Sequence, residues 1–172
     1  MSKSLGNFKT IRDILEQRQP ETLRFFLLGK HYRSPIDFSF DGMDDAERGL
    51  KRVYECLAEA ERARARAAWK PGTLPDEVTR EFDDLNRAFF EAMDDDFNTA
   101  AALGHVFGIV RLVNRVLEDK PLKNCQGAAE LLEKFARAAA DWSATLGVFG
   151  ARPEVFLREL RDTRAGRLGL DT

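Results

Sequence analysis

The sequence has few residues of the kinds that define sheet proteins, metal centres and secreted disulfide proteins. Its 172 residues include only two cysteines, two histidines and two tyrosines, and β-branched residues form few runs. Cys56 and Cys125 lie in unrelated segments without Cys-x-x-Cys spacing. With His31 and His105 they make no four-ligand zinc set. We expect both thiols to be reduced and buried in a cytoplasmic protein.

A signal peptide and a long apolar run are also missing. No continuous apolar stretch approaches the length of a membrane span, so we expect no membrane partner. The net charge of −2 excludes a protein that is basic over its whole surface. The charge is uneven, however, because residues 1–35 contain seven Lys or Arg and three Asp or Glu, a net +4. If RNA contacts this chain, these residues are the expected face.

Good helix formers dominate what is present. The composition, 44% hydrophobic and 33% charged, is typical of a globular protein rich in helices. Apolar residues recur at spacings of three and four in four long segments, which indicates amphipathic helices. These segments run from Asp41 to about residue 68, from Pro75 to Met93, from Leu103 to Leu117 and from Ala128 to Leu146. The pattern predicts an all-α fold built on an antiparallel four-helix bundle.

Single residues mark the expected helix ends and core. Asp41 is placed to cap the first long helix, and Asp96 or Asn98 to cap the third. Gly147 is placed to end the fourth. Phe107 lies at the centre of the apolar face of the third long helix, so we expect it in the core.

The first 40 residues are expected to form a separate small helical subdomain packed on one end of the bundle. Thr10 and Asp13 have capping-box spacing for a short helix. Pro20 suits the first turn of a second helix, which we expect to end at Ser34-Pro35. A short helix from Pro153 to Arg161 follows the bundle. The expected parts are therefore residues 1–40, the bundle at 41–162 and a truncated linker at 163–172.

The N-terminal loop is the strongest candidate for chemistry. Lys3 lies between Ser2 and Ser4, and Gly6 follows, all before any long apolar segment. Small neighbours let an ammonium group follow a phosphate as negative charge moves within it. The alternative interpretation is a frayed terminus without a function.

An aromatic and cationic cluster follows the second expected helix. His31, Tyr32 and Arg33 combine a stacking face with a guanidinium group, as in proteins that hold RNA backbones. Arg24 projects from the preceding helix, away from its apolar stripe of Leu23, Phe26 and Leu27. The alternative is that Tyr32 packs inside and Arg33 lies at a helix C-terminus.

Three consecutive carboxylates, Asp94, Asp95 and Asp96, have the chemistry to bind Mg²⁺. Their spacing from Asp83-Asp84 does not build a common site, and a solvated helix-capping loop is the favoured interpretation. We therefore predict no metal site and no complete set of catalytic residues in this sequence.

Four stretches stand in the order seen in cysteinyl-tRNA synthetases, a family of class I aminoacyl-tRNA synthetases. They are Ser2–Phe8, Leu23–Leu27, His31–Ser39 and Met93–Ala100. Met1 to Ser4 resemble the tail of the KMSKS loop, without its leading lysine. Leu23-Arg24 resembles the second half of the Asp-Ala-Leu-Arg motif that names the DALR domain, whereas Glu21-Thr22 replaces the first half. The sequence thus resembles the C-terminal part of this family, from the KMSKS loop through the DALR bundle.

The resemblance implies a function for the candidate residues. In the intact enzymes cysteine is activated with ATP and transferred to tRNA(Cys). Lys3, with Met1, Ser2 and Ser4, would hold the ATP phosphates. Arg24 and the His31–Arg33 stretch would be candidates for contact with the inner elbow of tRNA(Cys).

The resemblance also implies what is missing. The Rossmann fold, the HIGH signature and the ligands of the family's zinc ion are absent from this sequence, so we expect the isolated chain to be inactive. Its oligomeric state stays open. The alternative function is a free-standing, non-catalytic helical module that binds RNA or another protein.

Overall fold

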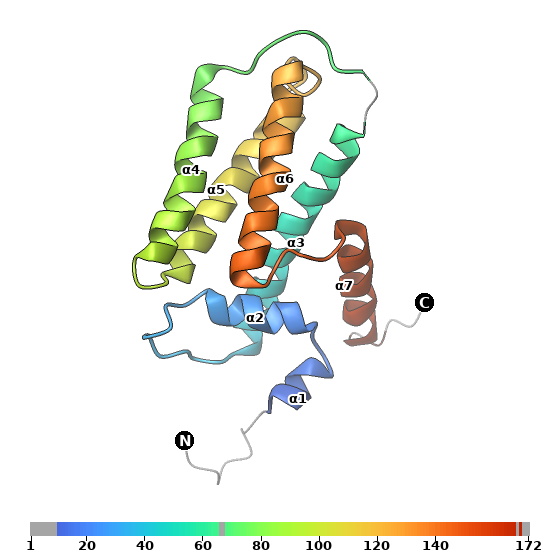
Figure 1. Ribbon diagram of the computed structural model, residues 1–172. Coiled ribbons are helices and arrows are strands. Elements are labelled where there is room, and N and C mark those ends of the chain that lie inside the picture. The colour runs from blue at the N-terminus through green and yellow to red at the C-terminus, as the bar shows by residue number, and fades with distance from the viewer. Residues whose placement is uncertain (1–9, 66–67, 168, 170–172) are drawn as a thin grey trace.

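The computed structural model describes residues 10–65, 68–167 and 169. Within these ranges the chain is helical, with one isolated bridge between Lys70 and Cys125 and no strand. Figure 1 shows α3 to α6 running side by side in alternating directions, with α2 across one end of the bundle. The predicted all-α fold is confirmed, while the domain boundaries stay predictions. The helices are α1 Ile11–Leu15, α2 Pro20–Leu28, α3 Phe40–Arg64, α4 Asp76–Asp94, α5 Thr99–Glu118, α6 Gln126–Leu146 and α7 Pro153–Arg167.

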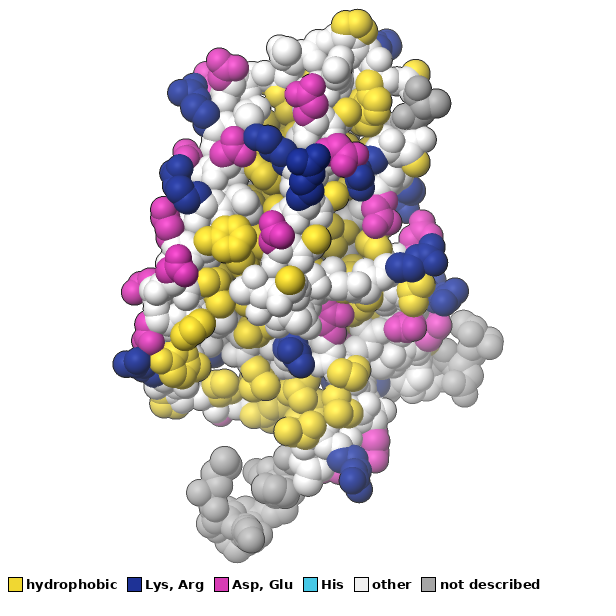
Figure 2. Space-filling view, viewed as in Figure 1, with side chains coloured by type: hydrophobic (Ala, Val, Ile, Leu, Met, Phe, Trp, Pro, Cys, Tyr) yellow, Lys and Arg dark blue, Asp and Glu magenta, His cyan; other side chains and the backbone are white. Residues whose placement is uncertain are grey.

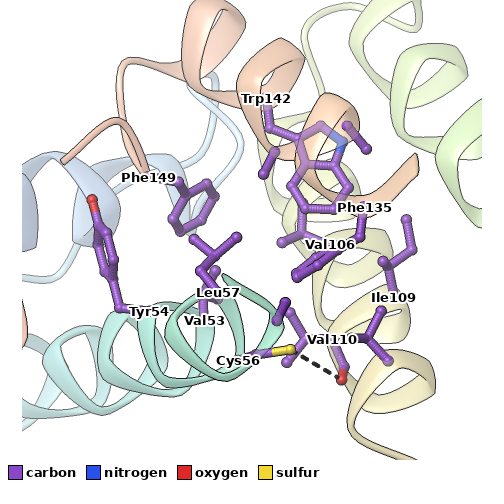
Figure 3. Packing of buried hydrophobic residues seen from close by; sticks show 14 of the residues in the cluster. Val53, Tyr54, Cys56, Leu57, Val106, Ile109, Val110, Phe135, Trp142 and Phe149 are labelled. Carbon is purple, nitrogen blue, oxygen red and sulfur yellow. Dashed lines mark hydrogen bonds between the residues drawn. The ribbon is translucent and has the colours of Figure 1, made fainter. Parts of the chain in front are cut away.

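The core lies where the four long helices face one another. Phe89 of α4 and Phe135 of α6 are fully buried beside Trp142 of α6. Their ring centroids lie 5.9 and 6.1 Å from that of Trp142. Val53 of α3 and Val110 of α5 complete this packing (Figure 3). The apolar spacing of three and four therefore places one stripe of each helix in a common interior.

The two cysteines are free and buried, as their isolation in the sequence predicts. The Cys56 sulfur lies 3.9 Å from the carbonyl oxygen of Val110, across the α3–α5 contact (Figure 3). Burial, and secondarily the charge of Glu59, raises the pKa of the Cys56 thiol to about 12. Cys56 therefore acts as a small apolar group and weak donor.

The connection between α3 and α4 crosses the bundle end opposite α2 (Figure 1). The amide of Lys70 donates to the carbonyl of Asn124 at 2.8 Å, and the amide of Gln126 donates to the carbonyl of Lys70 at 2.9 Å. A Cβ atom on Gly127 would lie 2.5 Å from the Leu74 nitrogen, so the crossing requires glycine there. The connection is thereby fixed to the start of α6.

Several predicted caps are confirmed. Thr10 and Asp13 form the reciprocal capping box of α1, with bonds of 2.8 and 3.1 Å. The Asn98 side chain accepts from the amide of Ala101 at 3.1 Å and caps α5. Gly147 ends α6 in the left-handed conformation at φ +66°.

Other predicted helix ends were wrong. Ser39 rather than Asp41 caps α3, because the Ser39 hydroxyl accepts from the amide of Gly42; the cap therefore lies two residues earlier than predicted. The second helix ends at Leu28, well before Ser34-Pro35, and the segment between is a loop. The last helix continues past Arg161 to Arg167.

Some predicted apolar faces were also misplaced. Phe107 is only partly buried at the edge of the bundle, where it meets Phe25 of α2 edge to face at 6.2 Å. In the small subdomain, Ile11 is 65% exposed and Leu27 is 46% exposed, and Phe25 is the buried aromatic of α2. α2 lies across one end of the bundle and α1 packs against α2, so each of these short helices buries only one row of side chains. Figure 2 shows apolar side chains gathered on the surface at that end.

One described helix, α5, is long and apolar enough to cross a membrane by composition alone. In the structure 56% of its apolar window is buried inside the molecule. Its hydrophobicity is therefore explained by its central place in the bundle, where it packs against α3, α4 and α6.

We expect Phe135→Ala to lower the free energy of unfolding by about 3–5 kcal/mol, the cost of removing a fully buried aromatic ring. Urea denaturation of the purified chain measures this change. The control is Phe97→Ala, at a side chain that is 66% exposed, with an expected change within about 0.5 kcal/mol. Equal effects of the two substitutions would contradict the location of the core.

Candidate functional site

The predicted site residues fall into two groups. Met1, Ser2, Lys3 and Ser4 lie outside the residues that the structure describes. The RNA-contact candidates are described: Arg24 on α2, and His31, Tyr32 and Arg33 in the loop between α2 and α3.

The loop that carries His31 to Arg33 lies against the turn between α4 and α5. The hydroxyl of Thr99, at the start of α5, donates to the carbonyl oxygen of Leu28 at the end of α2, at 2.8 Å. Asp96 and Phe97 in this turn both adopt left-handed backbone angles, with φ of 56° and 53°. Such angles cost roughly 1–2 kcal/mol for a residue with a Cβ atom, least for Asp and Asn. The turn therefore needs compensating contacts.

Asp96 supplies these contacts. Its Oδ1 accepts from the Tyr32 hydroxyl at 2.7 Å and from Arg33 Nη2 at 2.9 Å. The Nε of Arg33 donates to the Tyr32 hydroxyl at 2.9 Å. His31 Nε2 lies 3.7 Å from Asp96 Oδ2, and the His31 and Tyr32 rings stack with centroids 5.0 Å apart. These four residues, here called the Asp96 cluster, join the α2–α3 loop to the bundle.

The Asp96 cluster is open to solvent. Tyr32 is 59% exposed, and the Arg33 side chain is 67% exposed although it is paired. The Arg33 guanidinium carbon lies 5.4 Å from the centre of the Tyr32 ring. Tyr32 is thus not buried in the interior, and Arg33 pairs with a carboxylate. The arrangement offers a flat aromatic face beside a cation, with the charge partly neutralised by Asp96.

Asp96 itself was missed as a functional candidate. It was predicted to lie in a solvated loop in which Asp96 or Asn98 caps α5, and Asn98 is the residue that does so. Residues 32 and 96 are far apart in the sequence, so no local pattern pairs them. Only the resemblance to cysteinyl-tRNA synthetases connects them, because residue 32 lies in the matching stretch His31–Ser39 and residue 96 in the matching stretch Met93–Ala100.

Arg24 does not join this cluster. It lies beside the C-terminal end of α6, where a Cβ atom on Gly147 would be 2.5 Å from Arg24 Nη1. Arg24 also faces Glu21, one turn earlier, and its charge favours the ionised carboxylate. In this position Arg24 supports the contact between α2 and the bundle.

Glu21 is the centre of that contact. Its carboxylate accepts from the Tyr54 hydroxyl at 2.9 Å and from the amide of Phe149 at 2.6 Å. Burial raises the pKa of Glu21, and the bonds from Phe149 and Tyr54 oppose that rise. Burial and the neighbouring carboxylate raise the pKa of Tyr54 in turn. One side chain thus ties α2 to α3 and to the segment after α6.

A second buried carboxylate, Glu47 of α3, holds three arginines. Glu47 is 4% exposed and lies 3.0 Å from Arg18, in the loop before α2. Arg164 and Arg167 of α7 reach the same carboxylate at 3.3 and 2.9 Å. Sequence reasoning missed this cluster as well, because its members come from three distant segments.

The described residues do not fit a metal ion. Residues 10–65, 68–167 and 169 contain no group of three or more His, Cys, Asp or Glu side chains placed to hold one. Asp96 is engaged by Tyr32 and Arg33, so the three consecutive carboxylates do not converge on a common point.

Comparison with known proteins tests the resemblance. Residues 1–48 match the model of the class I (C) tRNA synthetase catalytic domain, and residues 88–150 match the DALR domain. The cysteine–tRNA ligase of Nitratidesulfovibrio vulgaris strain Hildenborough is 61% identical over 172 residues, which are all of this chain and 36% of that protein. Along its whole length the chain is similar to cysteine–tRNA ligases, and it carries a segment of each of the two matched domains. Both halves of the predicted resemblance are confirmed.

Other relatives give the same coverage. The cysteine–tRNA ligase of Oleidesulfovibrio alaskensis is 56% identical over 172 residues, and that of Lawsonia intracellularis is 50% identical over 171. The chain spans about a third of the length of these cysteinyl-tRNA synthetases, 36% and 35%. The Asp96 cluster joins the segment of the catalytic-domain match to the segment of the DALR match.

We expect Arg33 and Asp96 to be coupled by about 0.5–1 kcal/mol, because their pair is half exposed and screened by solvent. A double-mutant cycle with Arg33→Gln and Asp96→Asn, followed by urea denaturation, measures this energy. Asn tolerates the left-handed angle of residue 96, so the cycle isolates the charge. Asp95→Asn is the matched control and should show no coupling to Arg33; coupling of equal size there would contradict the cluster.

Proposed function

We propose that this chain forms the C-terminal part of the catalytic domain and the DALR bundle of a cysteine–tRNA ligase. Such an enzyme joins cysteine to ATP, releases pyrophosphate and transfers the cysteinyl group to tRNA(Cys). The observation that carries the proposal is 61% identity to a cysteine–tRNA ligase along the whole chain. That similarity includes both matched domains, which a free-standing module would not require.

In this proposal the Asp96 cluster contacts the tRNA. The exposed Tyr32 ring offers a face on which a base or ribose can stack, and Arg33 offers donors to a phosphate. Asp96 then holds both side chains at the surface of the free protein. Because Asp96 competes with phosphate for the same guanidinium, Arg33 would have to exchange partners or share them on binding.

The exposed apolar side chains of the small subdomain support the assignment to a larger enzyme. Ile11, Leu15, Leu27, Ile36 and Phe38 are each more than a third exposed and lie within the catalytic-domain match. An apolar surface of this kind is typical of an interface. We propose that it packs on the catalytic domain to which residues 1–48 belong.

We assign a role to this chain in binding ATP but none in binding zinc. Lys3, with Met1, Ser2 and Ser4, would hold the ATP phosphates. The described residues do not fit zinc, so no role for that ion is assigned to this chain. We place the enzyme in the cytoplasm, where its family charges tRNA.

We expect Lys3→Ala in the full-length protein to slow cysteinyl-adenylate formation by about 10²–10³-fold. One cation aimed at the departing pyrophosphate stabilises charge that develops in the transition state, so the rate should change more than ATP affinity. Single-turnover kinetics with ATP and cysteine separate the two quantities. A normal rate with weakened ATP binding would show that Lys3 contributes binding only.

We expect Arg33→Gln in the full-length protein to raise the KM for tRNA about 5- to 10-fold at low salt, the effect of losing one phosphate contact. Cysteine-dependent ATP–pyrophosphate exchange should be unchanged. Asp96→Asn should leave the KM for tRNA equal or lower, because it releases the guanidinium that Asp96 holds.

This contrast separates recognition from architecture. If the Asp96 cluster only fixed the loop to the bundle, both substitutions would break the same contact and raise the KM equally. A parallel rise in both variants would therefore contradict the proposed contact between Arg33 and tRNA.

A further inference from the structure

Four arginines line a shallow groove between α3 and α5, away from the Asp96 cluster. Arg48 and Arg52 are one turn apart on α3, and Arg111 and Arg115 are one turn apart on α5. Two hollows of about 530 and 570 Å³ adjoin along this groove and share Arg52 and Arg111. We call these four side chains the arginine surface.

The central pair of the arginine surface has no ion-pair partner among the described residues. Arg48 pairs with Asp45, and Arg115 pairs with Glu81 at 2.6 Å. Arg52 and Arg111 make no ion pair or side-chain hydrogen bond with any described residue, although they lie side by side in both hollows. Two neighbouring guanidinium groups that pair with no carboxylate repel each other, so their placement costs stability.

Three other arginines of the bundle each have a carboxylate partner. Arg62 pairs with Glu59 at 2.8 Å, and Arg87 pairs with Asp84 at 2.7 Å, each one turn away on its own helix. Arg64 forms a double hydrogen bond with Glu133 of α6. Carboxylates lie at both ends of the groove. Asp45 pairs with Arg48 at one end, and Glu118 and Asp119 lie at the other, where Asp119 accepts from the amide of Leu122 and helps to end α5.

Gly104 provides an independent observation on the same groove. It lies inside α5, where glycine destabilises a helix relative to alanine. A Cβ atom at Gly104 would meet nothing within 4 Å, whereas one at Gly49 or Gly108 would press on a neighbouring side chain. Packing therefore explains Gly49 and Gly108 but not Gly104. A glycine without a packing reason leaves helix backbone bare for the close approach of another molecule.

We propose that the arginine surface binds the phosphodiester backbone of RNA. Guanidinium groups match phosphate oxygens in geometry and charge, and an unpaired arginine has no internal bond to give up. A protein partner fits less well, because the large exposed apolar side chains needed for an interface core lie elsewhere among the described residues. The inference rests on the proposed function, in which that RNA is tRNA(Cys), and gives the bundle a second contact with it.

The test compares the full-length protein with its R52Q/R111Q double variant. The probe is a tRNA(Cys) transcript, and its binding is followed by fluorescence anisotropy from about 50 to about 200 mM salt. Each lost phosphate contact reduces the slope of log K against log salt by about one. We therefore expect the slope to fall by about two, and affinity at about 0.1 M salt to fall about 10-fold or more.

The matched control is R62Q/R87Q, which removes two exposed arginines from α3 and α4 that pair within their own helices. It changes the net charge equally and should leave the salt slope unchanged. A third variant, Gly104→Leu, should raise the thermal midpoint by strengthening α5 yet weaken tRNA binding by covering the bare backbone. A folding defect cannot produce that combination.

The outcomes separate the inference from the proposed function. Cysteine-dependent ATP–pyrophosphate exchange should be normal in the double variant; its absence in the wild-type protein would overturn the proposed function instead. A wild-type salt slope in R52Q/R111Q, or an equal loss in R62Q/R87Q, would overturn the arginine surface. Loss of binding to polyglutamate with tRNA binding intact would assign the surface to an acidic protein and overturn it as well.

Discussion

The position of the small subdomain depends on two carboxylates that have been removed from water. Glu21 is partly buried and Glu47 almost fully buried, and a carboxylate in such a place destabilises the fold unless donors replace its hydration. Tyr54 and the amide of Phe149 surround Glu21, whereas three arginines surround Glu47. These donors come from α3, from α7, from the loop before α2 and from the segment after α6. Each carboxylate therefore fixes several elements at once, and its charge stays compensated only while these elements remain together.

How far the sequence predicts this structure depends on the range of the interactions. The capping box at Thr10, the cap at Asn98 and the left-handed stop at Gly147 involve neighbours in sequence, and all three were predicted correctly. The four-helix bundle was predictable because apolar spacing reports which face of each helix is buried. Apolar spacing does not report how deep a side chain lies at the edge of the bundle, so Phe107 was placed too deep. It also does not report where a helix ends, so α7 was made too short.

The candidate site was predictable by residue type and not by partner. His31, Tyr32 and Arg33 were identified from their chemistry, but Asp96 comes from the turn between α4 and α5. That turn includes two residues with positive φ, a conformation that no composition rule indicates for Asp-Phe. The strain is local, while the contacts that offset it are distant. Pairings such as Arg33 with Asp96 and Arg167 with Glu47 can be recognised only when the fold is known.

The two proposed RNA surfaces differ in how far their charges are already neutralised. Arg33 is held by Asp96, so binding phosphate there replaces an existing ion pair, and the gain in affinity is the difference between two partners. Arg52 and Arg111 have no such partner among the described residues, so a phosphate there also relieves repulsion. The Asp96 cluster therefore suits orientation near the small subdomain, where geometry matters more than strength. The arginine surface suits affinity, because it stands on two helices of the bundle whose relative position is fixed by the core beneath them.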